Sequence, residues 1–522
     1  MTGLKASPPT PLRGERGAYR LFPKVYDETM TNHQAKEPYT PLSPRRGGGG
    51  EAEHQYIDLY QQARQLICDH SVAPMNAVRD AAFHAFCRQG FPSRKMERYR
   101  YTDVASLFAP NYGLNLNRLP IPVNPYQAFR CDVPNLSTLL YFVVNDGFYS
   151  GEREGYGGAS SARDGEESGE RRAESGENST LPKGVVIGSL AKNAHLIGNF
   201  YAQQASVDDD AVTALNTMLA QDGLLVYVPA NTKVDKAIQV INILKAPSNL
   251  PPEGEALMVN RRVLIVLEEG AEASLLFCDH AADDCHFLAT QVIEVYVGEG
   301  ARLDLCCLEE THAKSIRVSN VYIKQEARSQ VSHNIITLHN GITRSRLDVQ
   351  LAGEDAECVC NGCAISDKEQ HVDNNTLIAH HALHCTSREL YKYVLDERAT
   401  GAFAGRVLVE HGAQKTSSEM RNQNICASRE ARMFTQPMLE IYADDVKCSH
   451  GSTVGQLNDA ALFYMRQRGI GEREARLLLE QAFVGEVIDQ IALTPLRDRL
   501  RYLVEKRFRG ELNKCEGCKL CK

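Results

Sequence analysis

The sequence has no hydrophobic run long enough to cross a membrane. Its apolar stretches fall short of the roughly eighteen residues that a membrane-spanning helix requires. Its N-terminus has no lysine-led apolar segment of the kind that directs secretion. These absences predict a soluble, cytoplasmic protein, in which the 16 cysteines are free thiols rather than a disulfide framework.

Nucleotide-binding motifs are missing as well. No stretch matches the G-x-x-x-x-G-K-[ST] loop that cradles phosphates, and no Rossmann glycine fingerprint follows a strand-like run. The formal charge of -8 gives no basic field that would favour nucleic acid or an anionic membrane. The sequence therefore predicts no nucleotide bound by this chain, and neither nucleic acid nor membrane as a partner.

Two segments have little that could fill a core. Residues 1–53 are rich in Pro, Gly and Arg, and residues 151–180 contain no Val, Ile, Leu or Phe. Such compositions cannot bury enough apolar surface to offset the entropy lost on ordering. We expect both segments to be disordered, and the sequence alone leaves open whether Met1 or Met30 is the true start.

Helical periodicity is present near both ends of the remaining chain. Between residues 54 and 90 apolar residues stand three and four positions apart, which predicts two amphipathic helices ending at Gly90. We therefore expect a helical and mixed N-terminal region, 54–221, and a C-terminal helical region, 457–510. The apolar stripes expected in the latter are Ala475, Leu478, Leu479, Ala482 and Phe483, then Leu496, Leu500, Leu503, Val504 and Phe508.

Short β-branched runs replace this periodicity between residues 222 and 456. "EGAEASLLF", "EGARLDLCC", "QEARSQVSH" and "EDAECVCNG" align on Ala271, Ala301, Ala327 and Ala356, at intervals close to thirty residues. Units this small cannot close their own apolar faces, so strands of successive units must pair in parallel ladders. The sequence predicts a mainly β protein with a parallel β-helix core at 222–456, and the alternative is an antiparallel sandwich with similar strand spacing.

One stretch after the repeats combines a thiol and an imidazole, "DVKCSHGSTVGQ". On a strand, Cys448 and His450 point to the same face, about 7 Å apart. Two ligands do not make a zinc site, because structural zinc takes four protein ligands and catalytic zinc three. The residues alone leave three interpretations open: a metal site completed by another surface, a Cys-His nucleophilic pair, or two polar residues on a strand with no chemical role.

Other clusters give weaker indications. The spacing of His380 and His384 in "HHALHC" would suit a metal on a helix, but the β pattern around it favours a polar corner. Cysteines in "CVCNGC", at 358, 360 and 363, lie on the repeat and are expected to be small core residues. The tail, residues 511–522, has the two-residue gaps of iron-sulfur and zinc ligands but no fourth ligand; its cysteines are Cys515, Cys518 and Cys521.

Longer motifs carry a family resemblance. The stretch from "RVLVEHGAQKTSSEM" to "ADDVKCSHGSTVGQ" and on to "EREARLLLEQAFVGEVI" resembles the SufB/SufD family of iron-sulfur cluster assembly proteins, in the form of its SufD branch. "GFPSRKMERYRYTDVASL" is similar to the N-terminal signature of that branch, with Tyr99 where the family usually has Trp. The resemblance covers roughly residues 55–150 and 181–510, so the N-terminus, the insert and the cysteine tail lie outside it.

The resemblance implies a right-handed parallel β-helix between helical terminal regions, acting as a non-catalytic scaffold. It implies a SufB-like paralogue as partner through the β-helix, a SufC-like ATPase on the C-terminal helices, and a sulfur donor that acts on the complex. By position, Cys448 and His450 correspond to family residues at the SufB interface that help hold a transient Fe-S cluster. Whether a reduced flavin binds the complex stays open.

Three alternatives remain. The chain could be a SufB-type paralogue, which would need scaffold cysteines of its own. A β-helix polysaccharide enzyme would call for export and a carboxylate cluster in a groove, and the sequence has no export signal. A plain interaction scaffold would have no ligand role for His450.

Overall fold

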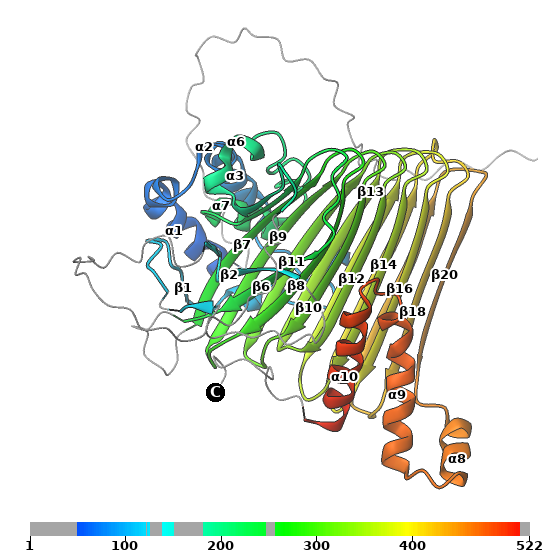
Figure 1. Cartoon of the computed structure of the whole chain (residues 1–522). Helices are drawn as coiled ribbons and strands as arrows, with labels where there is room; N and C mark the ends of the chain where they lie inside the picture. Colours follow the sequence, from blue (N-terminus) through cyan, green and yellow to red (C-terminus); the bar gives the residue numbers. More distant parts are fainter. Residues whose placement is uncertain (1–49, 122, 126–137, 151–180, 247–255, 512–522) are drawn as a thin grey trace, which may run out of the picture. The chain divides into compact units, whose positions relative to one another are not determined.

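Parallel strands wind the central part of the chain into a β-helix, drawn as nested arrows in Figure 1. The computed structural model describes residues 50–121, 123–125, 138–150, 181–246 and 256–511, all within one structural unit, residues 46–522. From β5 onward, successive strands alternate between two sheets, and neighbouring turns pair in parallel. The predicted parallel β-helix is confirmed, and the antiparallel sandwich is excluded because the strands of successive turns run in the same direction.

The first sheet, here the odd sheet, contains mostly odd-numbered strands, in the order β19-β17-β15-β13-β11-β9-β7-β5-β4, with β1 paired to β7. Its first pair, β4 and β5, is antiparallel. The strands are β1 (Tyr112–Gly113), β4 (Val186–Ser189), β5 (Leu224–Val228), β7 (Ala256–Leu267), β9 (His286–Val297), β11 (Ser315–Gln325), β13 (Ile342–Leu351), β15 (His371–His380), β17 (Thr400–Val409) and β19 (Arg432–Ile441).

The second sheet, here the even sheet, has the order β20-β18-β16-β14-β12-β10-β8-β6-β2-β3, and its pair of β2 and β3 is antiparallel. The wound strands from β5 to β20 span residues 224–455, against the predicted 222–456. The strands are β2 (Thr138–Val144), β3 (Gly147–Tyr149), β6 (Ala237–Leu244), β8 (Glu272–Ala281), β10 (Arg302–Glu310), β12 (Gln330–His339), β14 (Glu357–Ser366), β16 (Thr386–Leu395), β18 (Ser417–Cys426) and β20 (Lys447–Gly455).

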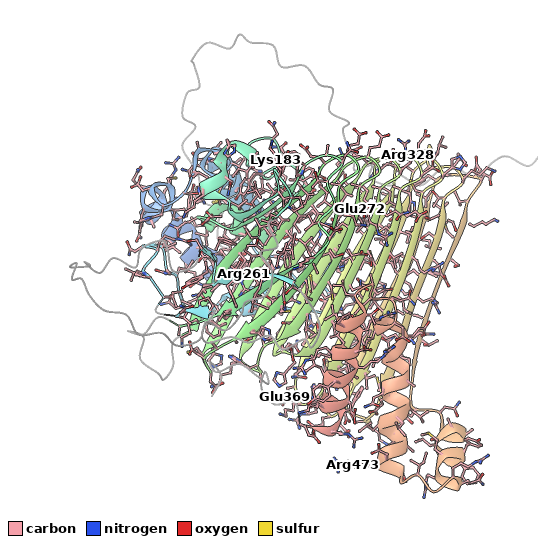
Figure 2. The ribbon with its side chains drawn as sticks, in the orientation of Figure 1. Lys183, Arg261, Glu272, Arg328, Glu369 and Arg473 are labelled. Carbon is pink, nitrogen blue, oxygen red and sulfur yellow. The ribbon has the colours of Figure 1, made fainter. Side chains whose placement is uncertain are left out.

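A small buried residue stands just before the even strands, where the chain turns inward. The residue preceding it has a φ between +56° and +64° in successive turns, as at Gly300, Arg328 and Asp355; Figure 2 shows Arg328 on this row of turns. Such a left-handed residue lets the backbone reverse direction within a few residues. The inward residues are Ala271, Ala301, Ser329, Ala356, Cys385 and Thr416, all at most 1% exposed.

One predicted repeat position was wrong. Strand pairing aligns Arg302 with Gln330, and Gln330 with Glu357. The equivalent of Ala301 is therefore Ser329, not Ala327. Both residues are small, so the sequence motif does not show which of them turns inward.

The N-terminal helices pack on the outer face of the odd sheet, against Met258, Leu288 and Val318. The first helix begins at Gly50, slightly before the predicted 54, and the Glu53 carboxylate accepts the Phe91 backbone N–H at 2.7 Å. The predicted helix end at Gly90 is confirmed. The helices are α1 (Gly50–Asp69), α2 (Ala73–Ala77), α3 (Arg79–Gln89), η1 (Glu97–Tyr99), α4 (Val104–Phe108), η2 (Ala191–Asn193), α6 (Ala194–Ile197) and α7 (Ala211–Leu219).

The C-terminal helices are α8 (Asp459–Gln467), α9 (Glu472–Ile488) and α10 (Thr494–Arg509), and α9 and α10 contact the even sheet (Figure 1). Two ion pairs, each with a buried cation, fix them there. The Lys392 ammonium on β16 lies 2.5 Å from Glu486 of α9, and the Arg507 guanidinium of α10 lies 2.6 Å from Asp367.

The predicted stripe on α10 faces the sheet: Leu496, Leu500, Leu503 and Val504 are buried, and Phe508 is partly buried. The stripe on α9 is only partly right, because Leu478 is 38% exposed. The buried face of α9 differs from the predicted stripe, because it also includes Leu477, Val484, Val487 and Ile488.

Of the segments predicted to be disordered, residues 1–49 and 151–180 lie outside the described residues, as do the cysteines of the tail. The prediction of disorder over 1–53 was wrong at its end, because residues 50–53 belong to α1. In the described ranges, no helix is long and apolar enough to span a bilayer.

Candidate functional site

The strand that contains the Cys-x-His motif is the last one of the even sheet. β20 pairs with β18, and β19 pairs with β17, and within the described part of the chain no later strand stacks on either. The turn that precedes β20 is held by an ion pair between Lys415 and Asp445 and by a 2.8 Å bond from the Asp445 N–H to the Gln414 side chain. We call this end of the β-helix the open end.

Cys448 and His450 both face the interior of the β-helix. β20 runs parallel to β18 in a register that places Cys448 beside Ser418 and His450 beside Met420. Paired residues of parallel neighbours share a face, and Met420 is fully buried in the core between the sheets. His450 is nevertheless exposed, because no further turn covers it.

The Cys448 thiol is half-buried against this core. Burial raises its pKa above the ordinary value of 9.0, and the hydrogen bond with the Ser418 backbone only partly opposes this. In this chain the group is therefore a neutral thiol at pH 7. A metal ion would have to displace its proton, because the thiolate is the form that ligates.

Apolar side chains gather around the same end. Phe434 is 40% exposed, Ile441 39%, Tyr442 54% and Val454 49%. A β-helix core that ends without a cap leaves its last turn in water, and exposed apolar surface of this kind marks contact sites. Pro437 lies in β19, a position that proline takes on edge strands.

This chain cannot hold a metal at the open end with its described residues alone. Across those residues, no three His, Cys, Asp or Glu side chains come close enough to bind an ion together. Cys448 and His450 could together offer one sulfur and one nitrogen ligand. A cluster held at this position would need its other ligands from a second chain.

The histidine-rich segment is a polar corner, as the β pattern favoured. His380 ends β15 and lies buried, with its Nε2 2.9 Å from the Ser387 hydroxyl, and burial lowers its pKa to about 4. His384 has a φ of +61° in the turn to β16. The helix that would bring His380 and His384 together is absent from this turn.

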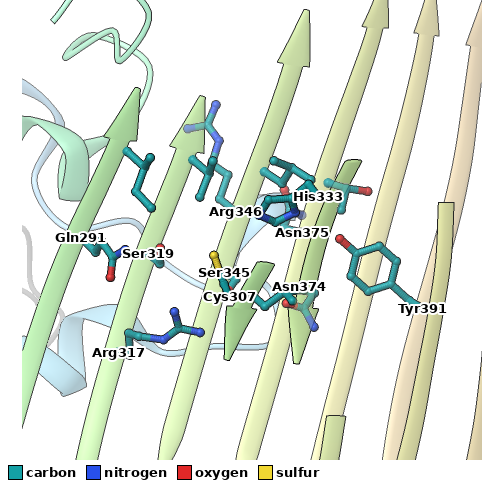
Figure 3. A pocket seen from close by; sticks show the side chains of 15 residues that line it. Gln291, Cys307, Arg317, Ser319, His333, Ser345, Arg346, Asn374, Asn375 and Tyr391 are labelled. Carbon is teal, nitrogen blue, oxygen red and sulfur yellow. The ribbon is translucent and has the colours of Figure 1, made fainter. Parts of the chain in front are cut away.

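The "CVCNGC" cysteines are core residues, as predicted: Cys358, Cys360 and Cys363 all lie on β14 and are at most 3% exposed. Cys358 and Cys360 point between the sheets, and their sulfurs lie 3.3 Å apart. A cavity of about 20 Å³ lies in this interior, and Cys307, His333 and Tyr391 are among its lining residues (Figure 3). Burial lowers the pKa of His333 to about 4, so its imidazole is neutral.

Sequence reasoning missed the aromatic and aliphatic residues of the open end. A signal was present in "RMFTQPMLEI", where apolar residues occupy both faces of one strand. Met433 and Leu439 face the core, whereas Phe434 points outward. When the last strand of a sheet is apolar on both faces, another surface is expected to cover its outer face.

Two family models match the chain. The model for the SufBD core domain of SUF-system FeS cluster assembly matches residues 251–483. The model for the SufBD protein N-terminal region matches residues 50–157 and 169–240. Together they cover the helical N-terminal region and most of the β-helix and α9.

Curated relatives agree with these models. An iron-sulfur cluster assembly SufBD family protein of Synechocystis is 27% identical over 430 residues, 80% of this chain and 87% of that protein. The chloroplastic protein ABCI7 of Arabidopsis thaliana is 28% identical over 444 residues, 83% and 86% of the two chains. The iron-sulfur cluster assembly protein SufD of Escherichia coli is 30% identical over 255 residues, 47% of this chain and 58% of that protein. The chain belongs to the SufBD family of iron-sulfur cluster assembly proteins of the SUF system.

Proposed function

We propose that this chain is a SufD-type, non-catalytic scaffold subunit that pairs with a SufB-like paralogue at its open end and there shares a nascent Fe-S cluster. The observation that carries the proposal is the position of Cys448 and His450. They are inward-facing residues of a turn on which nothing stacks within the described part of the chain, so their interior surface is available to another chain.

The incomplete ligand set supports sharing rather than independent binding. A thiol and an imidazole suit iron and sulfide chemistry, and in this chain they occur without a third ligand among the described residues. The exposed Ile441, Tyr442 and Val454 give the partner an apolar surface to cover. The cluster is the cargo of such a complex, and a sulfur donor must act on the assembled pair.

A second surface fits the ATPase partner. On the C-terminal helices, Phe463 is 61% exposed, Tyr464 58% and Tyr502 42%. A groove of about 710 Å³ runs between α9 and α10, with Leu478 and Tyr502 in its lining. We propose that the SufC-like ATPase binds here and supplies the nucleotide site that this chain lacks.

The ATPase contact can be tested without removing the helices that cover the even sheet. We expect Tyr464→Glu to weaken binding to the SufC-like ATPase at least about ten-fold, because a charge placed in an apolar contact stays desolvated and unpaired. The measurement is titration of the purified ATPase against the full chain. Leu119→Glu is the matched control, because Leu119 is 53% exposed in the N-terminal region.

Unchanged affinity of Tyr464→Glu would contradict the proposed surface. So would a chain truncated after residue 456 that still bound the ATPase as well as the full chain does. The purified chain alone should hydrolyse no ATP.

The alternative is a SufB-type subunit, and a plain β-helix scaffold without a ligand role is the third reading. Co-purification of this chain with SufB-like and SufC-like proteins, with the mass of the complex measured, separates the first two. A SufD-type chain should enter one complex with both partners, whereas a SufB-type chain should bind cluster without a paralogue.

The cysteine tail gives a further prediction. If Cys515, Cys518 and Cys521 hold metal with a fourth ligand from a partner, replacing all three by Ser should lower the iron bound per complex. Iron content is measured after anaerobic reconstitution, with Cys68→Ser as control because Cys68 lies in α1, outside the β-helix. Unchanged iron and an unchanged assembly rate would show that the tail is no ligand.

The cytoplasmic location stays a prediction. One relative is named chloroplastic, so a plastid is the alternative. A fluorescent reporter fused behind residues 1–53 would distinguish the two compartments.

A further inference from the structure

A short segment of the N-terminal region lies over the odd sheet and reaches its last strand at the open end. It comprises residues Glu97–Thr102, and we call it the strap. Its first three residues form the 3₁₀ turn η1, and Asp103 directly after it caps α4 by accepting the Ser106 N–H. The strap therefore has one firm attachment in the N-terminal helices.

The strap is locked onto β13 and β15 by buried polar contacts. The Arg344 guanidinium lies 3.8 Å from the centre of the Tyr99 ring and donates to the Arg98 carbonyl at 2.7 Å. The Thr102 hydroxyl donates to the Asp373 carboxylate at 2.6 Å and lies 2.9 Å from His371 Nε2. Tyr99 and Thr102 are each 2% exposed, so these contacts are shielded from water.

On β17, the residue in line with the strap's contacts is the small Ala402. Arg344, Asp373, Ala402 and Phe434 are aligned across β13, β15, β17 and β19 by the strand register. Ala402 is fully buried although it points outward, away from the core residue Phe403. A segment that passes closely over β17, between its contacts on β15 and on β19, accounts for this burial.

The strap reaches the last strand of the sheet. The Tyr101 ring stacks on Phe434 of β19, with centroids 4.9 Å apart and planes 18° from parallel. The Gln436 side chain of β19 donates to the Glu97 carboxylate at 2.6 Å. β19 is thus paired with β17 at one edge, and the strap contacts its outer face.

We infer that the strap is a positioning element for partner binding: Tyr101 and Glu97 hold the edge strand β19 in the conformation that the paralogous partner meets. This inference rests on the proposed pairing at the open end. It assigns a role in that pairing to the N-terminal helical region, which would otherwise have no connection to the partner.

The physical reason is that an edge strand is hydrogen-bonded on one side only. It frays more readily than an internal strand, because fewer contacts must break for it to open. An aromatic pair and a charge-assisted hydrogen bond on its outer face raise the cost of that opening. A strand already ordered pays less conformational entropy when a partner binds.

Hydrogen exchange of the isolated chain tests the first half of the inference. We expect Tyr101→Ala to speed exchange of the β19 amides about three- to ten-fold, while strands β7 to β13 exchange as in the wild type. Tyr101→Phe should restore slow exchange, because the stacking needs only the ring. Unchanged exchange in β19 would overturn the inference.

Affinity for the SufB-like partner tests the second half. Tyr101→Ala and Phe434→Ala should each weaken binding by a similar factor, and the double variant should be little worse than either, because both remove one stacked pair. Phe200→Ala is the matched control, since it removes an aromatic contact with Tyr296 of β9, 5.0 Å between centroids, on the same sheet away from the open end.

The two failures are distinguishable. Faster β19 exchange with unchanged partner affinity would show that the strap stabilises the strand without serving the interface, and would overturn the positioning role. A wild-type chain that binds no paralogue would count against the proposed function itself. Hydrogen exchange of the β19 amides would then test only whether the strap stabilises β19.

Discussion

The complex containing His450→Ala should assemble normally and bind about ten-fold less iron and sulfide than the wild-type complex. His450 is exposed on the last strand, so its removal takes little packing from this chain. An imidazole can ligate iron or accept a proton from a thiol, and alanine can do neither. The large effect should therefore fall on the cluster and not on assembly.

The measurement separates these two effects. Each variant complex is purified anaerobically, its subunit ratio is confirmed by mass, and iron and sulfide are assayed after reconstitution. His411→Ala is the matched control: His411 is another exposed imidazole at the same end, 5.5 Å from the Tyr442 ring, but it lies in the turn before β18. It should retain full cluster content.

Cys448→Ser distinguishes a ligand from a lining residue. The half-buried thiol is neutral in the free chain because burial raises its pKa. If the thiolate ligates iron, serine should lower cluster content about as much as His450→Ala does. If the thiol only lines the site, the loss should be small. Full cluster content in the His450→Ala complex would refute the shared site and leave this chain as a structural scaffold.

The repeat of the β-helix could be predicted because residues close together in the sequence specify each turn. A small inward residue recurs at the corner of successive turns, as at Ala271, Ala301 and Ala356, and β-branched runs follow it. Its register could not be predicted everywhere, since Ala327 and Ser329 fit the inward position equally well by size. Strand pairing over long sequence distance decides between them, and a local motif does not contain it.

The candidate site was predictable as residues but not as a surface. The period of a strand already places Cys448 and His450 on one face. The motif does not show which turn of the β-helix is the last. It therefore could not show that this face is the interior of a turn on which no further strand stacks. The contacts of Tyr101 with Phe434 and of Glu97 with Gln436 join residues more than 300 positions apart, and no spacing rule connects them.

Replacing Glu389 by Gln should stabilise this protein at alkaline pH. Glu389 lies on β16 with its side chain between the sheets, and it is 1% exposed. Register places it between Cys360 of β14 and Met420 of β18, and among the described residues no cation pairs with it. Burial raises its pKa from the ordinary 4.5 to about 7, and neither carboxylate oxygen has a hydrogen-bond partner among the described residues.

The sign follows from linkage between protonation and folding. The folded state holds the proton more tightly than the unfolded state, so the stabilisation is complete below about pH 4.5 and is lost as the pH rises through about 7. A rise of this size corresponds to about 3 kcal/mol. A glutamine side chain at this position would carry no charge at any pH. The variant should therefore exceed the wild type by up to about this amount at pH 8 and lose the advantage near pH 4.5.

Urea unfolding of both proteins between pH 5 and pH 8.5 measures the difference in the free energy of unfolding. Asp210→Asn is the matched control, because Asp210 is also buried and lies 3.3 Å from the Arg346 guanidinium. Burial raises the pKa of Asp210, but Arg346 and Arg344 outweigh this and hold that pKa below the ordinary 3.8. Removing a charge that the folded state stabilises should make this variant less stable than the wild type at pH 8. If Glu389→Gln also destabilised the protein at pH 8, the carboxylate would have a cationic partner in the interior, and the β-helix core at this turn would be ionic instead of neutral.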